Sequence, residues 1–339
     1  MILNTYQQPF YALGYALLIV LISGCASYPA LGNLTVSGRE QVEIKETPFY
    51  PQKTNQCGAA SLATMLAHRG VEISLEGLER QVYLPGRQGS LSIELTAQAR
   101  QHQMLVHKIP GSMDALLDEI AAGNPVMVLQ NLGFDWFAQW HYAVVVGYDL
   151  KKRTLILRSG ETKRHEVALK TFYATWRRGD FWGVVIAPPH IVPVSSTLIR
   201  FLDAASEHEQ VGQLDTAQQA YLTVLRRWPD HRLDVARLGL ANIAYHRGEY
   251  AIAKEWLRSA ILKDPYSLRS WNNMAFTLLK MNCHDQALTA IQCAVVHSNH
   301  ADLYLESQAE IMSAIRGTAN IDAVDTECVI PRCFGLNSE

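Results

Sequence analysis

The sequence predicts two folded units: an α+β unit with an antiparallel sheet over residues 46–188, and an all-α unit over residues 197–315. A chain of 339 residues is long enough for two domains. In the first unit the helical patterns precede the strand patterns instead of alternating with them, which favours an antiparallel sheet. The second unit is helical and repeats itself along the chain.

The composition excludes several classes of protein. The net charge is −2 with 18% charged residues, so no basic surplus points to nucleic acid. Hydrophobic residues make up 48%, which suffices for buried cores but not for a protein with many membrane spans. The six cysteines are scattered, which does not fit a small disulfide-stapled scaffold. We expect no cofactor.

The N-terminal residues 1–25 contain no charged residue and no histidine. Their uncharged apolar run, residues 10–24, is shorter than the roughly 20 residues that a membrane-spanning helix needs. Its length fits the core of a signal peptide better, with a single transmembrane helix as the alternative.

The end of this run resembles the lipobox of bacterial lipoproteins. The residues Ile22, Ser23, Gly24 and Cys25 carry the resemblance. It implies that Cys25 is lipidated and becomes the mature N-terminus, and Ala26 after it implies sorting to the outer membrane, facing the periplasm. Residues 26–45 contain Pro29, Gly32, Asn33 and Gly38, which indicate a flexible tether.

The α+β unit shows four segments of each kind. Helical patterns cover residues 57–69, 75–82, 91–102 and 112–122. Strand patterns cover residues 125–130, 141–148, 153–158 and 181–187. The prolines around residues 189–196 indicate a linker to the second unit.

The second unit contains a repeated helical motif. Gly212 and Gly248 begin two matching stretches 36 positions apart, each with an alanine five residues on and a proline at its end. A third copy starts at Asn282. This pattern resembles about three tetratricopeptide repeats, with an ordinary helical bundle as the alternative. The resemblance implies a concave surface for a protein partner. Residues 316–339 form a tail.

Cys57 opens the first predicted helix. A free cysteine is usually a core residue. At a helix N-terminus, however, the free N–H groups and the helix dipole stabilise a thiolate and lower its pKa. Gly58 and the alanines after it leave the sulfur open to a substrate backbone. Gln52, five residues upstream, could donate its side-chain amide to an oxyanion.

A nucleophilic thiolate needs a base, and His141 is the best-placed histidine. It begins a buried strand just after an aromatic loop, where a cleft would form. His68 is eleven residues beyond Cys57 on the same helix, roughly 16 Å away, and cannot reach the sulfur. His107 remains possible.

A third residue would orient the histidine. The strands 141–148 and 153–158 form a plausible hairpin, which places the partner of His141 near residues 160–162. The candidates are Ser159 and Glu161. A serine hydroxyl can bond the imidazole, but it stabilises an imidazolium less than a carboxylate does.

The segments around Cys57 and His141 together resemble the C39-like cysteine peptidase family. The resemblance rests on "QCGAASL" at residues 56–62 and "WHYAVVVG" at residues 140–147, and it spans residues 46–188. It implies a papain-like fold and a Cys–His mechanism, with Gln52 near the oxyanion. Two positions depart from the family pattern: Ser159-Gly160 replaces Asp-Pro, and Gln52 is five residues before the cysteine instead of six.

The resemblance does not predict the substrate. Well-known family members cut leader peptides after a double glycine and are fused to exporters. This sequence has neither the P-loop motif nor the multi-span region of an exporter. Double-glycine specificity is therefore not expected.

The remaining cysteines suggest structural roles. Cys283 and Cys293 are expected to be small core residues, whereas Cys328 and Cys333 could close a short disulfide. Neither pair has the spacing of a zinc site, so no metal is expected.

Three functions fit these observations. The first is an envelope lipoprotein that hydrolyses a peptide substrate and docks a protein through its repeats. The second is an inactive peptidase-like clamp that acts as a scaffold. The third is a related acyl-transfer enzyme, such as an amidase or a transglutaminase-like enzyme.

Overall fold

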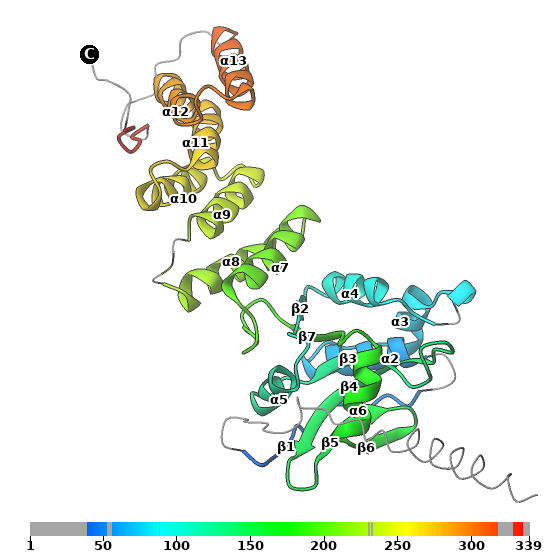
Figure 1. Cartoon of the computed structure of the whole chain (residues 1–339). Helices are drawn as coiled ribbons and strands as arrows, with labels where there is room; N and C mark the ends of the chain where they lie inside the picture. The colour runs from blue at the N-terminus through cyan, green and yellow to red at the C-terminus, as the bar shows by residue number, and fades with distance from the viewer. Residues whose placement is uncertain are drawn as a thin grey trace, which may run out of the picture.

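The computed structural model of the chain describes residues 39–52, 56–87, 89–229, 231, 233–317 and 328–334. The predicted signal peptide, Cys25 and most of the predicted tether lie outside these residues. An α+β unit is followed by a stack of helices, which confirms the predicted fold class (Figure 1). Within the described residues no helix is both long and apolar enough to cross a bilayer.

The α+β unit is built on one seven-stranded sheet whose pairs are all antiparallel. Its strands are β1 (Gln41–Glu43), β2 (Leu105–Lys108), β3 (Val126–Asn131), β4 (Trp140–Asp149), β5 (Thr154–Ser159), β6 (Thr162–Ala168) and β7 (Gly183–Ala187). The order is β2-β7-β3-β4-β5-β6, and β1 pairs with the last residues of β4 beyond the end of β3. Strand β4 is therefore central.

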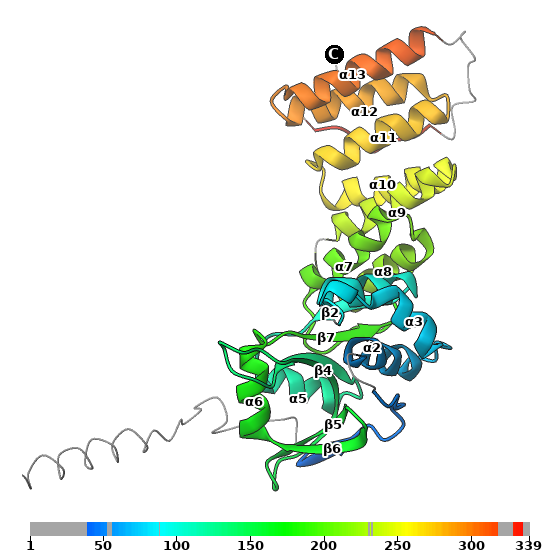
Figure 2. The same cartoon turned by 90° about the vertical axis from the view of Figure 1, so that its right-hand side faces the viewer.

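Helices cover both faces of this sheet, which explains why β4 is apolar on both faces. Its faces belong to two separate core clusters, one containing Tyr142 and Val144 and the other Ala143 and Val145. The first cluster is closed by α2 (Cys57–His68), α3 (Leu75–Val82) and α4 (Ser92–Gln101), and the second by α5 (Met113–Ala121) and α6 (Leu169–Arg178). The result is a three-layer arrangement (Figure 2). A 3-10 turn, η2 (Pro85–Arg87), joins α3 to α4.

Among the described residues of the α+β unit, three strands and one helix were not indicated by the sequence patterns: β1, β2, β6 and α6. The first of them corrects the predicted tether, because residues 41–43 pair with β4 and Ile44 is buried in the core. The ordered domain thus begins before residue 46. Strand β6 escaped prediction because nearly all its side chains are exposed and show no apolar alternation.

The second unit consists of consecutive helices that pack as antiparallel pairs, which is consistent with the predicted repeats. They are α7 (Leu198–Gln210), α8 (Leu214–Arg227), α9 (Asp234–His246), α10 (Tyr250–Lys263), α11 (Leu268–Lys280), α12 (His284–His297) and α13 (Asp302–Arg316). The repeated turn position has a positive φ in Gly212, Gly248 and Asn282. Glycine and asparagine tolerate this left-handed conformation best, which explains why they recur there.

The cysteine pairing differs from the expectation. Cys283 is bonded to Cys328 and Cys293 to Cys333, with Cα–Cα distances of 5.5 and 6.0 Å. The prediction of a Cys328–Cys333 bridge and of unpaired core residues at 283 and 293 is therefore wrong. The helices of the third pair bring the two upstream cysteines beside the C-terminal segment, which sequence spacing could not reveal.

The two units share a packed junction. Phe201 of α7 lies in a cluster with Leu105 of β2 and stacks on His107, with 5.1 Å between ring centroids. The linker is held as well, because the buried carboxylate of Glu119 accepts hydrogen bonds from the backbone N–H and the hydroxyl of Ser195.

Candidate active site

Cys57 is the first residue of α2, and it is partly buried and not disulfide-bonded. Among the described residues no side chain caps this helix, because the carboxamide of Gln56 instead donates to Glu79 over 2.7 Å. The helix then runs through the core with Gly58–Leu66 all buried. Gly58 lies against Ser90, so that a β-carbon at position 58 would be 2.8 Å from that of Ser90.

The electrostatics of Cys57 differ from the expectation based on the helix N-terminus. Burial raises the pKa of the thiol above its ordinary value. Hydrogen bonds from backbone groups, foremost that of Tyr142 and then those of Gly58 and Cys57 itself, act in the opposite direction but are outweighed. The loss of hydration therefore exceeds the effect of the first-turn N–H groups, and the protonated thiol is the favoured form.

His141 and Ser159 are brought together by the β4–β5 hairpin. The imidazole Nε2 and the serine Oγ share a hydrogen bond of 2.8 Å. The ladder pairs Val144 with Arg158, so the partner of His141 lies just beyond the end of β5. Glu161, the alternative partner, is exposed to solvent in the following turn.

Burial also lowers the pKa of His141, and the nearby His165 lowers it further. A neutral imidazole is the form that can accept a proton. Because Nε2 is engaged with Ser159, Nδ1 is the nitrogen that remains for proton transfer.

Gln52 is fixed to the turn that follows Ser159. Its backbone N–H donates to the carbonyl of Gly160 and its carboxamide oxygen accepts from the N–H of Gly160, both over 3.1 Å. The carboxamide oxygen is occupied by this bond, so any oxyanion would be bound by the NH₂ group. The side chain is 9% exposed.

These contacts connect the four candidate residues in one region. The sulfur of Cys57 is hydrogen-bonded to the backbone of Tyr142, the residue after His141. His141 is hydrogen-bonded to Ser159, and Gly160, the residue after Ser159, is hydrogen-bonded to Gln52. His107 does not join them, because it lies on β2, three strands from β4 in the sheet order. His68 is separate as well, with its Nδ1 3.4 Å from the hydroxyl of Thr47.

Sequence reasoning missed Tyr142. Besides its backbone contact with the sulfur, its hydroxyl is 2.8 Å from the hydroxyl of Ser92 at the start of α4. Tyr142 thus links the strand of His141 to the segment beside Gly58. Its position directly after the histidine was the available signal. Within the described residues no group of His, Cys, Asp or Glu forms a candidate metal site.

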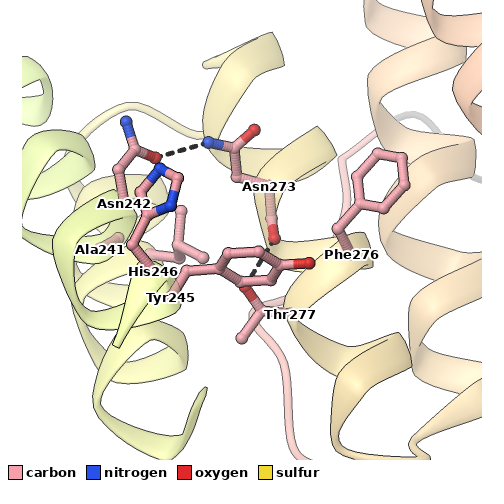
Figure 3. A pocket seen from close by; sticks show the side chains of 8 residues that line it. Ala241, Asn242, Tyr245, His246, Asn273, Phe276 and Thr277 are labelled. Atoms are coloured by element: carbon pink, nitrogen blue, oxygen red, sulfur yellow. Dashed lines mark hydrogen bonds between the residues drawn. The ribbon is translucent and has the colours of Figure 1, made fainter. Parts of the chain in front are cut away.

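The helical unit has a cavity of its own between α9 and α11 (Figure 3). Tyr245 and His246 of α9 and Phe276 and Thr277 of α11 line it. At its edge Asn273 donates to Asn242 over 2.8 Å, and Asn242 in turn donates to Glu209 of α7 over 3.1 Å. Polar side chains of three alternate helices, α7, α9 and α11, thus form one hydrogen-bonded row.

Several solved structures align with one part of this chain. A C39-like peptidase from Bacillus anthracis is 17% identical over 47% of this chain and 100% of its own, with a TM-score of 0.37. The peptidase domain of Streptococcus ComA, a bifunctional ABC transporter, is 23% identical over 42% of this chain and 99% of its own, with a TM-score of 0.35. The first TPR of Spaghetti (RPAP3) bound to an HSP90 peptide is 11% identical over 35% of this chain and 93% of its own, with a TM-score of 0.33.

No curated protein matches the chain significantly. A family model does match: the Peptidase_C39 like family covers residues 44–181. This range includes Gln52, Cys57, His141 and Ser159. Residues 44–181 therefore match the Peptidase_C39 like family, and the chain carries a C39-like domain ahead of its helical unit.

Proposed function

We propose that the chain is a cysteine peptidase of the bacterial envelope that hydrolyses peptide bonds with Cys57 and His141. One observation carries this proposal. A reduced cysteine begins α2 beside the strand whose second residue is His141, and that histidine is bonded to Ser159 over 2.8 Å. A thiol and an imidazole that is held at one nitrogen are the parts that this chemistry requires.

Each group has a defined role in the reaction. His141 takes the proton of the thiol, and the sulfur attacks the peptide carbonyl carbon. The NH₂ group of Gln52 and the N–H groups at the start of α2 bind the resulting oxyanion. His141 then gives its proton to the leaving amine, and the C–N bond breaks to leave an acyl-enzyme. Water, deprotonated by His141, hydrolyses the thioester and restores the thiol.

The proton transfer starts from two neutral groups. Burial raises the pKa of Cys57 and lowers the pKa of His141, so the thiolate–imidazolium pair is disfavoured before substrate binds. Charge then develops only during the attack, when the oxyanion donors can stabilise it. Ser159 keeps the ring in position during both transfers.

The test is a comparison of peptide termini in the envelope of cells with wild-type protein or with Cys57→Ala. New termini that depend on Cys57 and on His141 are expected. A Ser313→Ala variant, changed at an exposed position of α13, serves as the matched control and should behave as wild type. Identical termini in all strains would refute hydrolysis.

We further propose that Cys25 anchors the protein in the outer membrane and that the helical unit docks a protein partner. Two disulfides in the helical unit support an oxidising compartment such as the periplasm. The cavity between α9 and α11 supports a docking role for that unit. Incorporation of labelled palmitate into wild type and not into Cys25→Ala would test the anchor.

A second candidate is a peptidase-like binding protein without activity. The raised pKa of Cys57 and the serine in place of a carboxylate at position 159 favour it. In this case Cys57→Ala would leave both the peptide termini and the complexes formed in the envelope unchanged, whereas a peptidase loses its cleavage products.

A further inference from the structure

The exposed apolar side chains of the peptidase domain are concentrated in two short segments. Among the described residues between 39 and 187, every large hydrophobic side chain classed as exposed falls within residues 91–93 or 132–140. These side chains are Leu91, Ile93, Leu132, Phe134, Trp136, Phe137 and Trp140. Scattered exposed apolar residues are normal, but a concentrated patch marks an interaction site.

Both segments border the candidate active site. The hairpin 132–140 runs directly into His141. On the other side, Ser92 bonds the hydroxyl of Tyr142, and Ser90 packs on Gly58 next to Cys57. The two apolar segments therefore approach the Cys57–His141 region from different elements, α4 and the β3–β4 hairpin.

The aromatic hairpin is held in place by hydrogen bonds. Asn131, only 3% exposed, accepts from the N–H groups of Gly133 and Gln139 over 3.0 and 2.9 Å. Phe134 and Phe137 exchange two backbone hydrogen bonds, and Arg178 of α6 donates to the carbonyl of Asn131. The protein thus holds these rings in water on a constrained loop, with Trp136 83% exposed.

Such a loop is suited to bind apolar groups. The rings of Phe134 and Trp136 are nearly parallel, with centroids 5.5 Å apart. Rigid aromatic side chains lose little entropy on binding and bury a large area. Asp135 is the only charged residue in 132–140, and residues 89–93 carry no charge. The surface therefore favours neutral or basic ligands with large apolar side chains.

We propose that segments 89–93 and 132–140 form the two walls of a substrate cleft, whose ligands are polypeptides with large apolar side chains on both sides of the reacting bond. A polypeptide is preferred to a lipid surface because both patches are continuous with the candidate catalytic residues. The inference rests on the proposed function for the reacting bond, but the peptide preference can be measured by itself.

The first experiment measures binding without cleavage. Cys57→Ala protein is titrated into two fluorescein-labelled peptide libraries of equal length, with Phe, Leu or Trp at fixed positions in one and Ser or Asn in the other. Fluorescence anisotropy should show at least tenfold tighter binding of the apolar library. Adding Trp136→Ala and Phe137→Ala should remove most of this preference. Equal affinity for the two libraries would overturn the inference.

A matched control distinguishes binding at this site from nonspecific hydrophobic binding. Leu262 of α10 is 61% exposed, close to the 60% of Phe137, but it lies in the helical unit. Leu262→Ala should leave the preference unchanged. Vesicles of phosphatidylcholine and phosphatidylglycerol test the other occupant: if the hairpin substitutions abolish vesicle binding and leave peptide binding intact, the surface docks to lipid and the inference fails.

The second experiment tests cleavage. A proteome-derived peptide library is digested with wild-type protein, and residues around the cut bonds are compared with those in uncut peptides. Large apolar residues should be enriched on both sides, and Trp136→Ala should lower kcat/KM about tenfold for such peptides. Cleavage without enrichment would overturn the inference alone. Apolar binding with no cleavage would overturn the proposed hydrolysis while the binding surface stands.

Discussion

Cys57 and His141 share one feature at the residue scale: burial opposes the charged form of each. It raises the pKa of the thiol and lowers the pKa of the imidazole. The effects are opposite in sign because poor solvation destabilises the anionic form of the thiol and the cationic form of the imidazole. The free protein therefore holds a neutral thiol and a neutral imidazole between the two pKa values.

We predict that Cys57 is alkylated slowly at neutral pH. Only the thiolate reacts with iodoacetamide, so the labelling rate should rise through a midpoint above 9.0, the ordinary value of the thiol. Mass spectrometry of the Cys57 peptide across a range of pH gives this curve. A rate that has already levelled off by pH 7 would show instead that a thiolate–imidazolium pair outweighs the effect of burial.

Ser159 gives a second test at this scale. Ser159→Asp places a carboxylate beside the imidazole, which favours the imidazolium and should raise the pKa of His141. Ser159→Ala removes one neutral hydrogen bond and should slow cleavage about fivefold. An NMR titration of the His141 ring signals measures the pKa without relying on activity. If neither substitution moves that pKa, the serine does not act on the histidine.

Counting residues along the two strands placed the partner of His141 near residues 160–162 and left Ser159 and Glu161 as candidates. In the structure Ser159 makes the hydrogen bond to His141. The sequence did not predict the raised pKa of Cys57. Burial at that position comes from a core cluster whose residues lie far apart in the chain and meet only after folding. Local sequence reveals the free N–H groups of a helix end but not the solvent that is lost around it.

At the scale of elements, segments with an apolar period were predicted and exposed ones were not. Strands β3, β4, β5 and β7 are buried runs and were recognised from their apolar residues. Strand β6 is an exposed edge without that pattern. Helix α6 is a different case, because Leu169, Phe172 and Trp176 are buried at helical spacing and the pattern could have been read.

The first turn of α2 provides a prediction for an element. Gly58→Ala would place a β-carbon 2.8 Å from that of Ser90, so the start of α2 and the segment before α4 must move apart. We expect a loss of about 1–3 kcal/mol in the free energy of unfolding. Denaturant titration measures it, and Ser90→Gly in the same chain should recover most of the loss. No recovery would mean that the strain is not at this contact.

At the scale of the whole molecule, two disulfides link residues 328–334 to the start and the middle of helix α12. They join positions that are 45 and 40 residues apart. Cross-links over loops of this length restrict the unfolded chain and typically stabilise a fold by about 2–4 kcal/mol each. Reduction should therefore weaken the helical unit more than the peptidase domain.

Peptide mapping without reductant tests this pairing. Linked peptides for Cys283–Cys328 and Cys293–Cys333 are expected, and a Cys328–Cys333 link would contradict the structure. Addition of dithiothreitol should lower the melting temperature of the helical unit. Cys328→Ser together with Cys283→Ser should reproduce part of that decrease without reductant.

The junction between the two units contains a buried histidine that bears on stability. His107 is 4% exposed, and neither ring nitrogen has a hydrogen-bond partner among the described residues. One face of its ring stacks on Phe201 of α7. Burial lowers the pKa of His107 from 6.5 to about 4, so the ring is neutral in the folded protein at physiological pH.

We predict that this histidine makes the protein less stable in mild acid. The unfolded chain binds the proton near pH 6.5 but the folded chain only near pH 4, so stability is full above pH 6.5 and falls as the pH drops between these values. The loss attributable to His107 should be about 3 kcal/mol. Denaturant titrations at pH 7 and pH 4 measure it.

Two variants serve as controls for this prediction. His107→Phe preserves a ring against Phe201 but cannot be protonated, so its stability should change less with pH. His190→Gln, at an exposed position, should match wild type. An equally steep loss in His107→Phe would assign the acid sensitivity to other groups.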